Sequence, residues 1–286
     1  MVQNIWLIPL GFLIGTYGTL IGAGGGFILM PILLLLYPTE NLELLTSISL
    51  AVVFFNALSG STVYARMRRI DYRSGFLFST ATIPGAILGA LTTAHVPRRL
   101  FDGIFGCLMI AVSVFLLLRL NRKNGVKRDN LNSHWMRNLV KASGANHTYS
   151  YNLIVGVGLS FFVGYISSLF GIGGGIIHVP ALVHILNFPV HIATATSQFI
   201  LAVMALTGTI VHIVTGVFSH GVRRTVLLAI GVLLGAQLGA WLSTRVHGDW
   251  IIRSLAIALG FVGIRILLEV CDMGQYFMCI FDSPLR

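Results

Sequence analysis

The sequence predicts an all-α polytopic membrane protein, with about eight hydrophobic helical segments in two repeated four-segment halves. Three observations support this fold class. The 286 residues are 56% hydrophobic and only 10% charged, whereas soluble domains carry about 25% charged residues. Apolar stretches long enough for membrane-spanning helices recur along almost the whole chain. A glycine-rich element occurs twice, once in each half.

The first apolar segment, residues 5–37, contains this element at Gly15–Pro31, with the sequence GTYGTLIGAGGGFILMP. The element returns at Gly164–Pro180 as GYISSLFGIGGGIIHVP, within a segment at 151–186. Because glycine clusters weaken helices, the first segment of each half should be broken there. At about 1.5 Å per residue, each segment is longer than a hydrocarbon core of about 30 Å requires. We therefore expect a bent span, a strong tilt or a re-entrant hairpin that turns at the glycines.

The remaining segments follow in order along both halves. They lie at about 44–65, 75–95 and 99–119, and then at about 192–216, 223–245 and 250–269. These limits define a first repeat at 1–120, a basic linker at 121–150, a second repeat at 151–270 and a tail at 271–286. The linker is the only long polar stretch, and a surface helix is expected in it around Trp135 to Val140. The tail shows no interpretable pattern.

Two shorter matches extend the duplication beyond the glycine element. LSGS at 58–61 corresponds to LTGT at 206–209, and GAILGA at 85–90 corresponds to GAQLGA at 235–240. Internal repeats of this kind are typical of secondary transporters, whose binding sites lie where the repeats meet.

The net charge of +10 is explained by the positive-inside rule, under which Lys and Arg collect in cytoplasmic loops. Whether or not the glycine-broken segments cross the membrane, most basic residues fall on the side of the linker. The linker is therefore predicted to be cytoplasmic. The expected surroundings are a lipid bilayer, and no nucleic acid is expected as a partner.

The glycine elements also predict a binding site. A helix interrupted within a membrane is tolerated only where the break is buried in protein or lines a watery cavity. The helix that restarts after the glycines presents free N–H groups and the positive end of its dipole, a combination that binds anions. Hydroxyl-rich starts of the next segments could add neutral donors. The predicted substrate-binding residues are Gly22, Gly24, Gly25, Gly26, Thr46, Ser47, Ser49, Gly171, Gly173, Gly174, Gly175, Thr194, Thr196, Ser197 and Gln198.

The same residues also have purely structural explanations. The glycines could serve close helix packing of the small-xxx-small kind, and the hydroxyls could cap helices or bond between them. Asn56, Ser59 and Thr207 lie deeper on the same segments. His178, directly after the second glycine cluster, is a possible proton or anion contact, as is His212 within its segment. For either histidine the alternative is a neutral, hydrogen-bonded ring.

No catalytic residue, cofactor or metal site is predicted. The three cysteines form no even-numbered framework, and the histidines have no credible metal-ligand spacing. The sequence contains no nucleophile elbow, Walker loop, H-E-x-x-H motif or dinucleotide fingerprint.

The duplicated G-x-G-G-G-x-x-x-x-P element, the stretch TSISLAVVFFNALSGSTVYARMRRIDYRSG and the following PGAILGA resemble the TauE/SafE family of sulfite and organosulfonate exporters. The resemblance covers nearly the whole chain apart from the linker and the tail. It implies a bacterial-type plasma-membrane permease that moves a sulfur-containing anion or a small carboxylate. The second half has SHGVRR where the first has RMRRIDYR, so any inference from that basic loop applies only once.

We therefore expect a secondary transporter, an exporter of a small anion such as sulfite or an organosulfonate, that works by alternating access around the paired helix breaks. The alternative is a channel-like or structural membrane protein whose glycines only pack helices. An intramembrane enzyme is a third hypothesis, and it would need a single essential serine or histidine. The sequence makes no prediction of oligomeric state, coupling ion or exact substrate.

Overall fold

The computed structural model describes residues 5–120, 135–140, 146–243, 253 and 256–268. The chain forms two compact units, one of residues 1–94 with 125–251 and one of residues 95–124 with 252–286. The first unit contains both glycine elements and is described first. The predicted tail and much of the predicted linker lie outside the described residues.

The described part of the first unit contains nine helical elements, and five of them are long and apolar enough to cross a membrane: α3, α4, α6, α8 and α9. The elements are α1 (Leu7–Ile21), α2 (Gly26–Leu36), α3 (Leu42–Arg66), α4 (Tyr72–Thr93), α6 (Leu153–Phe170), α7 (Gly175–His184), α8 (Val190–Val214), the 3-10 turn η2 (Val217–His220) and α9 (Val222–Leu242). The described residues of the predicted membrane segments are mainly helical. Both predicted breaks are present, since α1 ends at Gly22 and α6 ends at Gly171.

The linker differs from its prediction. Residues Trp135–Val140 form a strand, β1, that pairs antiparallel with β2 (Asn146–Tyr151), so the expected surface helix at 135–140 is wrong. Both strands contain aromatic or β-branched residues that favour extended backbone. A strand is stabilised by its partner, and the sequence of β1 alone does not show that β2 will pair with it.

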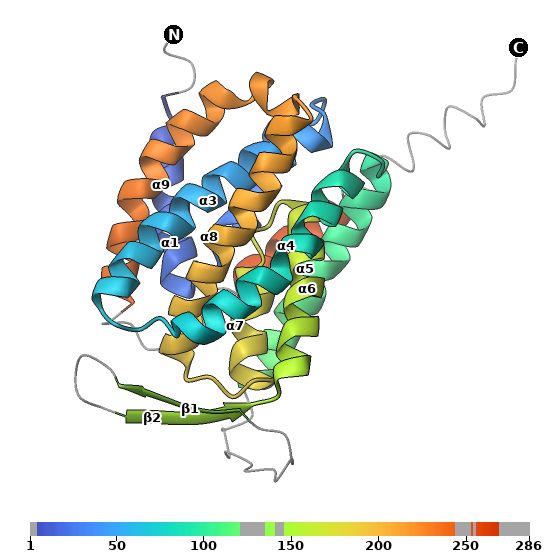
Figure 1. The fold of residues 1–286 in the computed structure, drawn as a ribbon. Helices are drawn as coiled ribbons and strands as arrows, with labels where there is room; N and C mark the ends of the chain where they lie inside the picture. Colours follow the sequence, from blue (N-terminus) through green and yellow to red (C-terminus); the bar gives the residue numbers. More distant parts are fainter. Residues whose placement is uncertain (1–4, 121–134, 141–145, 244–252, 254–255, 269–286) are drawn as a thin grey trace, which may run out of the picture. The chain divides into compact units, whose positions relative to one another are not determined.

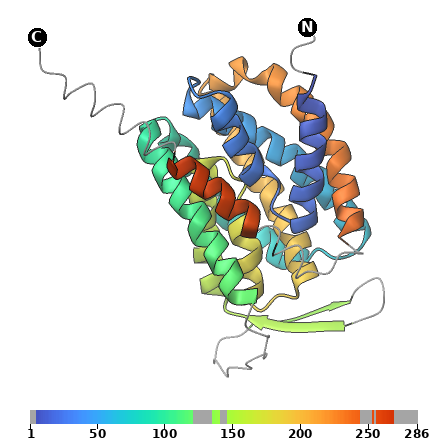
Figure 2. The same cartoon turned by 180° about the vertical axis from the view of Figure 1, so that it is seen from behind.

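Each broken segment folds back on itself as a helical hairpin. The start of α2 lies against α1, because a Cβ at Gly25 would be 3.0 Å from the carbonyl oxygen of Ile14. In the other hairpin, a Cβ at Gly174 would be 2.7 Å from Ser167 Oγ, and the His178 ring lies 3.4 Å from Ser160 Oγ. Figure 2 shows α1 running away from the N-terminus and α2 returning toward the same end. The sequence left a bent span, a tilt and a hairpin open, and the structure has the hairpin.

Each hairpin packs against a helix from the other half of the chain. Gly231 and Gly235 of α9 lie against the carbonyls of Ile8 and Phe12 of α1, so these two helices run parallel. In the same way, Gly85 and Gly89 of α4 lie against Phe161 and Tyr165 of α6. Glycine permits this close backbone approach, as it does in many membrane proteins.

Helices α3 and α8 cross at the centre in opposite directions. Leu50 of α3 meets Gly208 of α8, whereas Gly60 of α3 meets Gln198. Helix α9 starts beside the start of α3, where Gly221 meets Ile48. Helix α4 starts just after the end of α3. Helices α9 and α4 therefore begin at opposite ends of the unit. The α1–α2 hairpin therefore enters from one end and the α6–α7 hairpin from the other (Figure 1).

Outward faces of this unit are apolar. On α9, Val226, Ile230 and Leu234 are 51%, 45% and 59% exposed, and their four-residue spacing places them on one stripe. Continuous apolar stripes of this kind suit contact with lipid rather than water.

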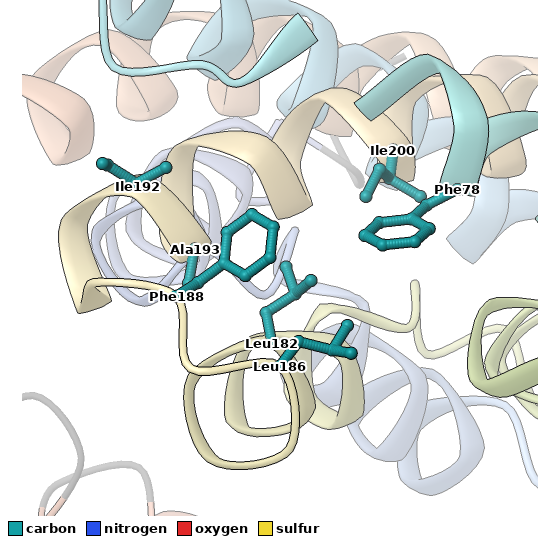
Figure 3. Packing of buried hydrophobic residues seen from close by; sticks show 7 residues of the cluster. All are labelled: Phe78, Leu182, Leu186, Phe188, Ile192, Ala193 and Ile200. Carbon is teal, nitrogen blue, oxygen red and sulfur yellow. The ribbon is translucent and has the colours of Figure 1, made fainter. Parts of the chain in front are cut away.

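A hydrophobic cluster closes the end of the unit where α4 and α6 begin. Phe78 of α4 meets residues from α7, from the connection after it and from α8 (Figure 3). The members are Phe78, Leu182, Leu186, Phe188, Ile192, Ala193 and Ile200. This cluster fixes the outer end of the α6–α7 hairpin against α4 and α8.

The second unit contains α5 (Arg98–Leu120) and the helix Ala256–Leu268. The two helices pack antiparallel, because Gly106 faces Leu267 while the Ser113 hydroxyl donates to the Ala256 carbonyl at 2.6 Å.

Candidate functional site

The two glycine breaks have the same backbone conformation. In the first, φ is 81° at Gly22, 74° at Gly24 and 78° at Gly25. In the second, φ is 65° at Gly171, 78° at Gly173 and 63° at Gly174. L-residues with side chains adopt this left-handed region only at a cost, so the turn needs glycine at these positions. One turn geometry is thus built twice, at the positions that the sequence aligns.

The two turns touch each other at the centre of the unit. Gly24 and Gly173 both lie between Val53 of α3 and Leu201 of α8. A Cβ at Gly26 would be 2.7 Å from the carbonyl oxygen of Ile172 in the opposite turn. The structure therefore brings the predicted glycines of both halves together in one place, in close backbone contact.

Helices α2 and α7 both start at this contact, at Gly26 and Gly175. N–H groups in the first turn of a helix have no acceptor within the helix, and the dipole adds partial positive charge there. Both helices also contain a proline, Pro31 and Pro180, at their sixth position. The centre of the unit therefore holds two helix N-termini that approach from opposite ends.

Two serines tie these turns to the central helices in a reciprocal way. Ser49 of α3 donates to the Gly171 carbonyl at 2.5 Å, and Ser197 of α8 donates to the Gly22 carbonyl at 3.3 Å. Each serine thus bonds the turn of the other half. Gly22 and Gly171 are the residues that follow α1 and α6, where carbonyls lack intrahelical partners.

The other predicted hydroxyls make local bonds. Thr46, Ser47 and Thr194 donate to carbonyls one turn earlier on their own helices. The Thr196 hydroxyl accepts the Asp71 N–H at 3.1 Å. Such bonds satisfy the hydroxyls within the protein, and a role for them in substrate binding stays a prediction.

Gln198 differs from the hydroxyls. It is fully buried, and neither atom of its amide has a hydrogen-bond partner among the described residues. Asn56 of α3 is also fully buried; its Oδ1 accepts from Thr19 Oγ1 at 3.0 Å, while its Nδ2 has no partner in the described part of the chain. Leaving a buried donor unpaired costs about 1–3 kcal/mol. Asn56 was not among the main predicted site residues, although an amide at membrane depth is itself a signal.

The His178 ring packs against α6 and α4. His178 is buried, its ring lies 3.4 Å from Ser160 Oγ of α6, and Phe78 of α4 is its aromatic neighbour. This position makes it part of the packing between α4, α6 and α7. A role as a proton or anion contact stays a prediction.

His212 lies in the last turn of α8. Its Nδ1 is 3.7 Å from Oε1 of Glu43, in the first turn of α3, and the Thr215 hydroxyl donates to the same oxygen at 3.4 Å. Glu43 therefore lies at a helix end rather than in the middle of a segment.

Long apolar helices, apolar outward faces and two interrupted helices whose breaks meet define this chain as a polytopic helical membrane protein. The family model described as sulfite exporter TauE/SafE matches residues 7–266. The chain therefore belongs to the TauE/SafE family, and it is a membrane transporter of that type.

Named relatives agree with this assignment. The chain is 32% identical over 269 residues to the probable membrane transporter protein YunE of Bacillus subtilis strain 168, covering 92% of this chain and 97% of the relative. It is 24% identical over 274 residues to a probable membrane transporter protein of Methanocaldococcus jannaschii, with 92% and 94% covered. A third, YdhB of Bacillus subtilis, is 26% identical over 238 residues, with 82% and 88% covered. No solved structure matches the chain.

Proposed function

We propose that the protein is a secondary transporter that exports a small anion, such as sulfite or an organosulfonate, by alternating access around the two glycine turns. The observation that carries this proposal is the direct contact between the turns, each followed by a helix N-terminus. Helix N-termini at membrane depth stabilise anionic groups because their N–H groups and dipoles face the ligand.

The proposal includes inverted repeats at 1–120 and 151–270. Three correspondences support it: α1 packs on α9 as α6 packs on α4, the hairpins enter from opposite ends, and Ser49 and Ser197 make reciprocal bonds. Inverted repeats around a midplane site can rock so that the site opens to either side in turn. The hydroxyls and glycines predicted from the sequence would line this pathway.

The orientation follows from charge. Arg66, Arg68, Arg69 and Arg73 lie at the connection from α3 to α4, at the end where α6 also begins after the linker. At the opposite end, Arg224 pairs with Glu40 at 2.9 Å. The positive-inside rule therefore favours a cytoplasmic linker in a bacterial inner membrane. A potential negative inside would favour outward movement of an anion by about 2.3 kcal/mol per charge per 100 mV.

The substrate class rests on the site and on the family description, which names sulfite. The side chains that contact the turns are uncharged, among them Ser49, Val53 and Ser197, so the donors there are neutral side chains and backbone N–H groups. Such donors can bind a small oxyanion by hydrogen bonds, without a fixed positive charge in the site.

The alternative is a channel-like or structural protein, and one observation favours it. The glycines of both turns are in close contact with protein atoms, as expected if they only pack helices. This alternative predicts no saturable flux.

The test is flux of labelled sulfite, methanesulfonate and acetate into proteoliposomes, with the membrane potential and the pH gradient set independently. The proposal predicts saturable flux of at least one oxyanion, above the leak of protein-free liposomes. Flux equal to the leak for all three, at every potential and pH gradient, would refute the transporter function.

A further inference from the structure

We propose that Thr19, Asn56 and Gln198 form a binding subsite for the oxyanion group of the substrate, on the side of the first glycine turn. This inference rests on the proposed transport function and specifies which side chains of the site contact the ligand. It selects small monovalent oxyanions, such as a sulfonate, as the ligand class.

The three residues come from three different helices and converge at Gly60. Thr19 is in the last turn of α1, Asn56 and Gly60 are one turn apart on α3, and Gln198 is on α8. A Cβ at Gly60 would lie 2.8 Å from the Thr19 methyl carbon, 3.3 Å from Thr19 Oγ1 and 3.6 Å from Gln198 Nε2. Thr19 Oγ1 in turn donates to Asn56 Oδ1 at 3.0 Å. The polar atoms of all three residues therefore gather around one point of α3 that carries no side chain.

This cluster holds three buried polar atoms with unused hydrogen-bonding capacity. Asn56 Nδ2, Gln198 Nε2 and Gln198 Oε1 have no partner among the described residues, although both side chains are fully buried. Most buried polar groups in proteins are paired, and exceptions call for a ligand, a water or a functional explanation. Two complete amide groups at one place, in a membrane segment, are not needed for packing, since leucine would fill the same space without unpaired donors.

The donor balance indicates the ligand. Two free NH₂ groups against one free carbonyl oxygen favour a ligand that mainly accepts hydrogen bonds, and oxyanion oxygens do so. None of the three side chains is charged, so the cluster supplies no counter-charge. Because the cost of removing an ion from water rises steeply with its charge, neutral donors should accept a monoanion more readily than a dianion.

The corresponding place in the second half lacks the amides. The residues that align with Thr19, Asn56 and Gln198 are Ser168, Met204 and Leu50. Met204 and Leu50 have no amide, and a Cβ at Gly208, which aligns with Gly60, would lie against Ser168 and Leu50. The subsite therefore exists once, and Ser168, a buried hydroxyl without a partner among the described residues, provides a matched control.

The test compares Asn56→Leu, Gln198→Leu and the control Ser168→Ala by concentration-dependent flux of labelled methanesulfonate in proteoliposomes. Losing a hydrogen bond to a charged group should raise KM about 10-fold to 100-fold in each Leu variant. Ser168→Ala should keep the KM of the unmodified protein. Melting in detergent provides a second readout: methanesulfonate should raise the melting temperature of the unmodified protein and of Ser168→Ala, but not of the Leu variants.

The variant Asn56→Asp distinguishes an anionic ligand from a cationic ligand at this subsite. The added carboxylate should abolish methanesulfonate flux, and ethanedisulfonate, a dianion, should compete poorly in the unmodified protein. Unchanged KM in both Leu variants, an equal rise in Ser168→Ala, or sodium-dependent activity in Asn56→Asp would overturn the subsite while leaving transport established. Absence of flux in the unmodified protein would instead refute the proposed function, and the subsite with it.

Discussion

Replacing Gly175 by Ala tests the contact between the two turns most sharply. A Cβ at this position would lie 2.5 Å from Ala23 Cα and also collide with the Gly22 carbonyl, both in the opposite turn. The backbone of Gly175 is helical, so no strain from a positive φ complicates the substitution. Because the colliding atoms are backbone atoms, only separation of the two turns can relieve the overlap.

The expected cost follows from this geometry. Overpacking a tight interior costs about 1–3 kcal/mol, and a clash with backbone belongs at the upper end of that range. Alanine gains up to about 1 kcal/mol of helix propensity over glycine, although less at the first residue of a helix. We therefore expect a net loss of about 2–3 kcal/mol, or a melting temperature lower by about 4–12 °C.

The control is Gly158→Ala on α6, where a Cβ would have no atom within 4 Å. This variant should melt at or slightly above the temperature of the unmodified protein, since only helix propensity changes. Thermal unfolding of the detergent-purified variants, followed by size-exclusion chromatography, measures both. A Gly175→Ala protein as stable as Gly158→Ala would show that the two turns are not in contact.

Three further predictions follow from the fold. Ser49→Ala should lower the melting temperature by the equivalent of about 1–3 kcal/mol, because the Gly171 carbonyl loses its buried donor; an unchanged melting temperature would contradict that bond. Phe78→Ala should lower the free energy of unfolding by about 3–5 kcal/mol in the same assay, because it opens a cavity in the cluster of Figure 3. A loss below about 1 kcal/mol would contradict that packing. Ile5→Cys and Tyr72→Cys, each in a background whose three native cysteines are replaced, should react with a membrane-impermeant thiol reagent from opposite sides of the membrane, since α1 and α4 begin at opposite ends; labelling of both from one side would refute the opposed hairpins.

The sequence predicts the helix ends well where the signal is local. The helices end at Gly22 and Gly171 because glycine alone adopts the turn at low cost, and the runs around them are apolar enough to be helical. The limits of α3 and α8 also lie within a few residues of the predicted segments. These features depend on neighbours in the chain.

Features that depend on contacts between distant parts of the chain could not be predicted from the sequence. The apolar run at 5–37 fits a bent span as well as a hairpin, and only the contact of Gly25 with Ile14 distinguishes them. The pairing of β1 with β2 depends in the same way on a second segment. Nothing in the sequence of α1 indicates that it packs on α9, although Gly231 and Gly235 show a suitable face.

The candidate site shows the same division. Sequence pattern identified the glycines and the hydroxyl-rich segments, but residue type could not tell which hydroxyls are satisfied on their own helices. Thr46 and Ser47 bond to carbonyls one turn earlier, whereas Ser49 reaches the other half. Asn56 gains its interest only from the three-dimensional proximity of Thr19 and Gln198 to Gly60.

Counterflow in proteoliposomes tests the central claim, alternating access, most directly. Liposomes containing the protein are loaded with unlabelled methanesulfonate and diluted into a trace of the labelled anion, with no membrane potential or pH gradient. A carrier whose site faces one side at a time should accumulate label transiently above the outside concentration. Each unlabelled anion that moves outward leaves the site facing the outside, where it binds a labelled anion and carries it in. A channel-like protein would give a monotonic approach to equal concentrations, and that result would contradict alternating access around the paired glycine turns.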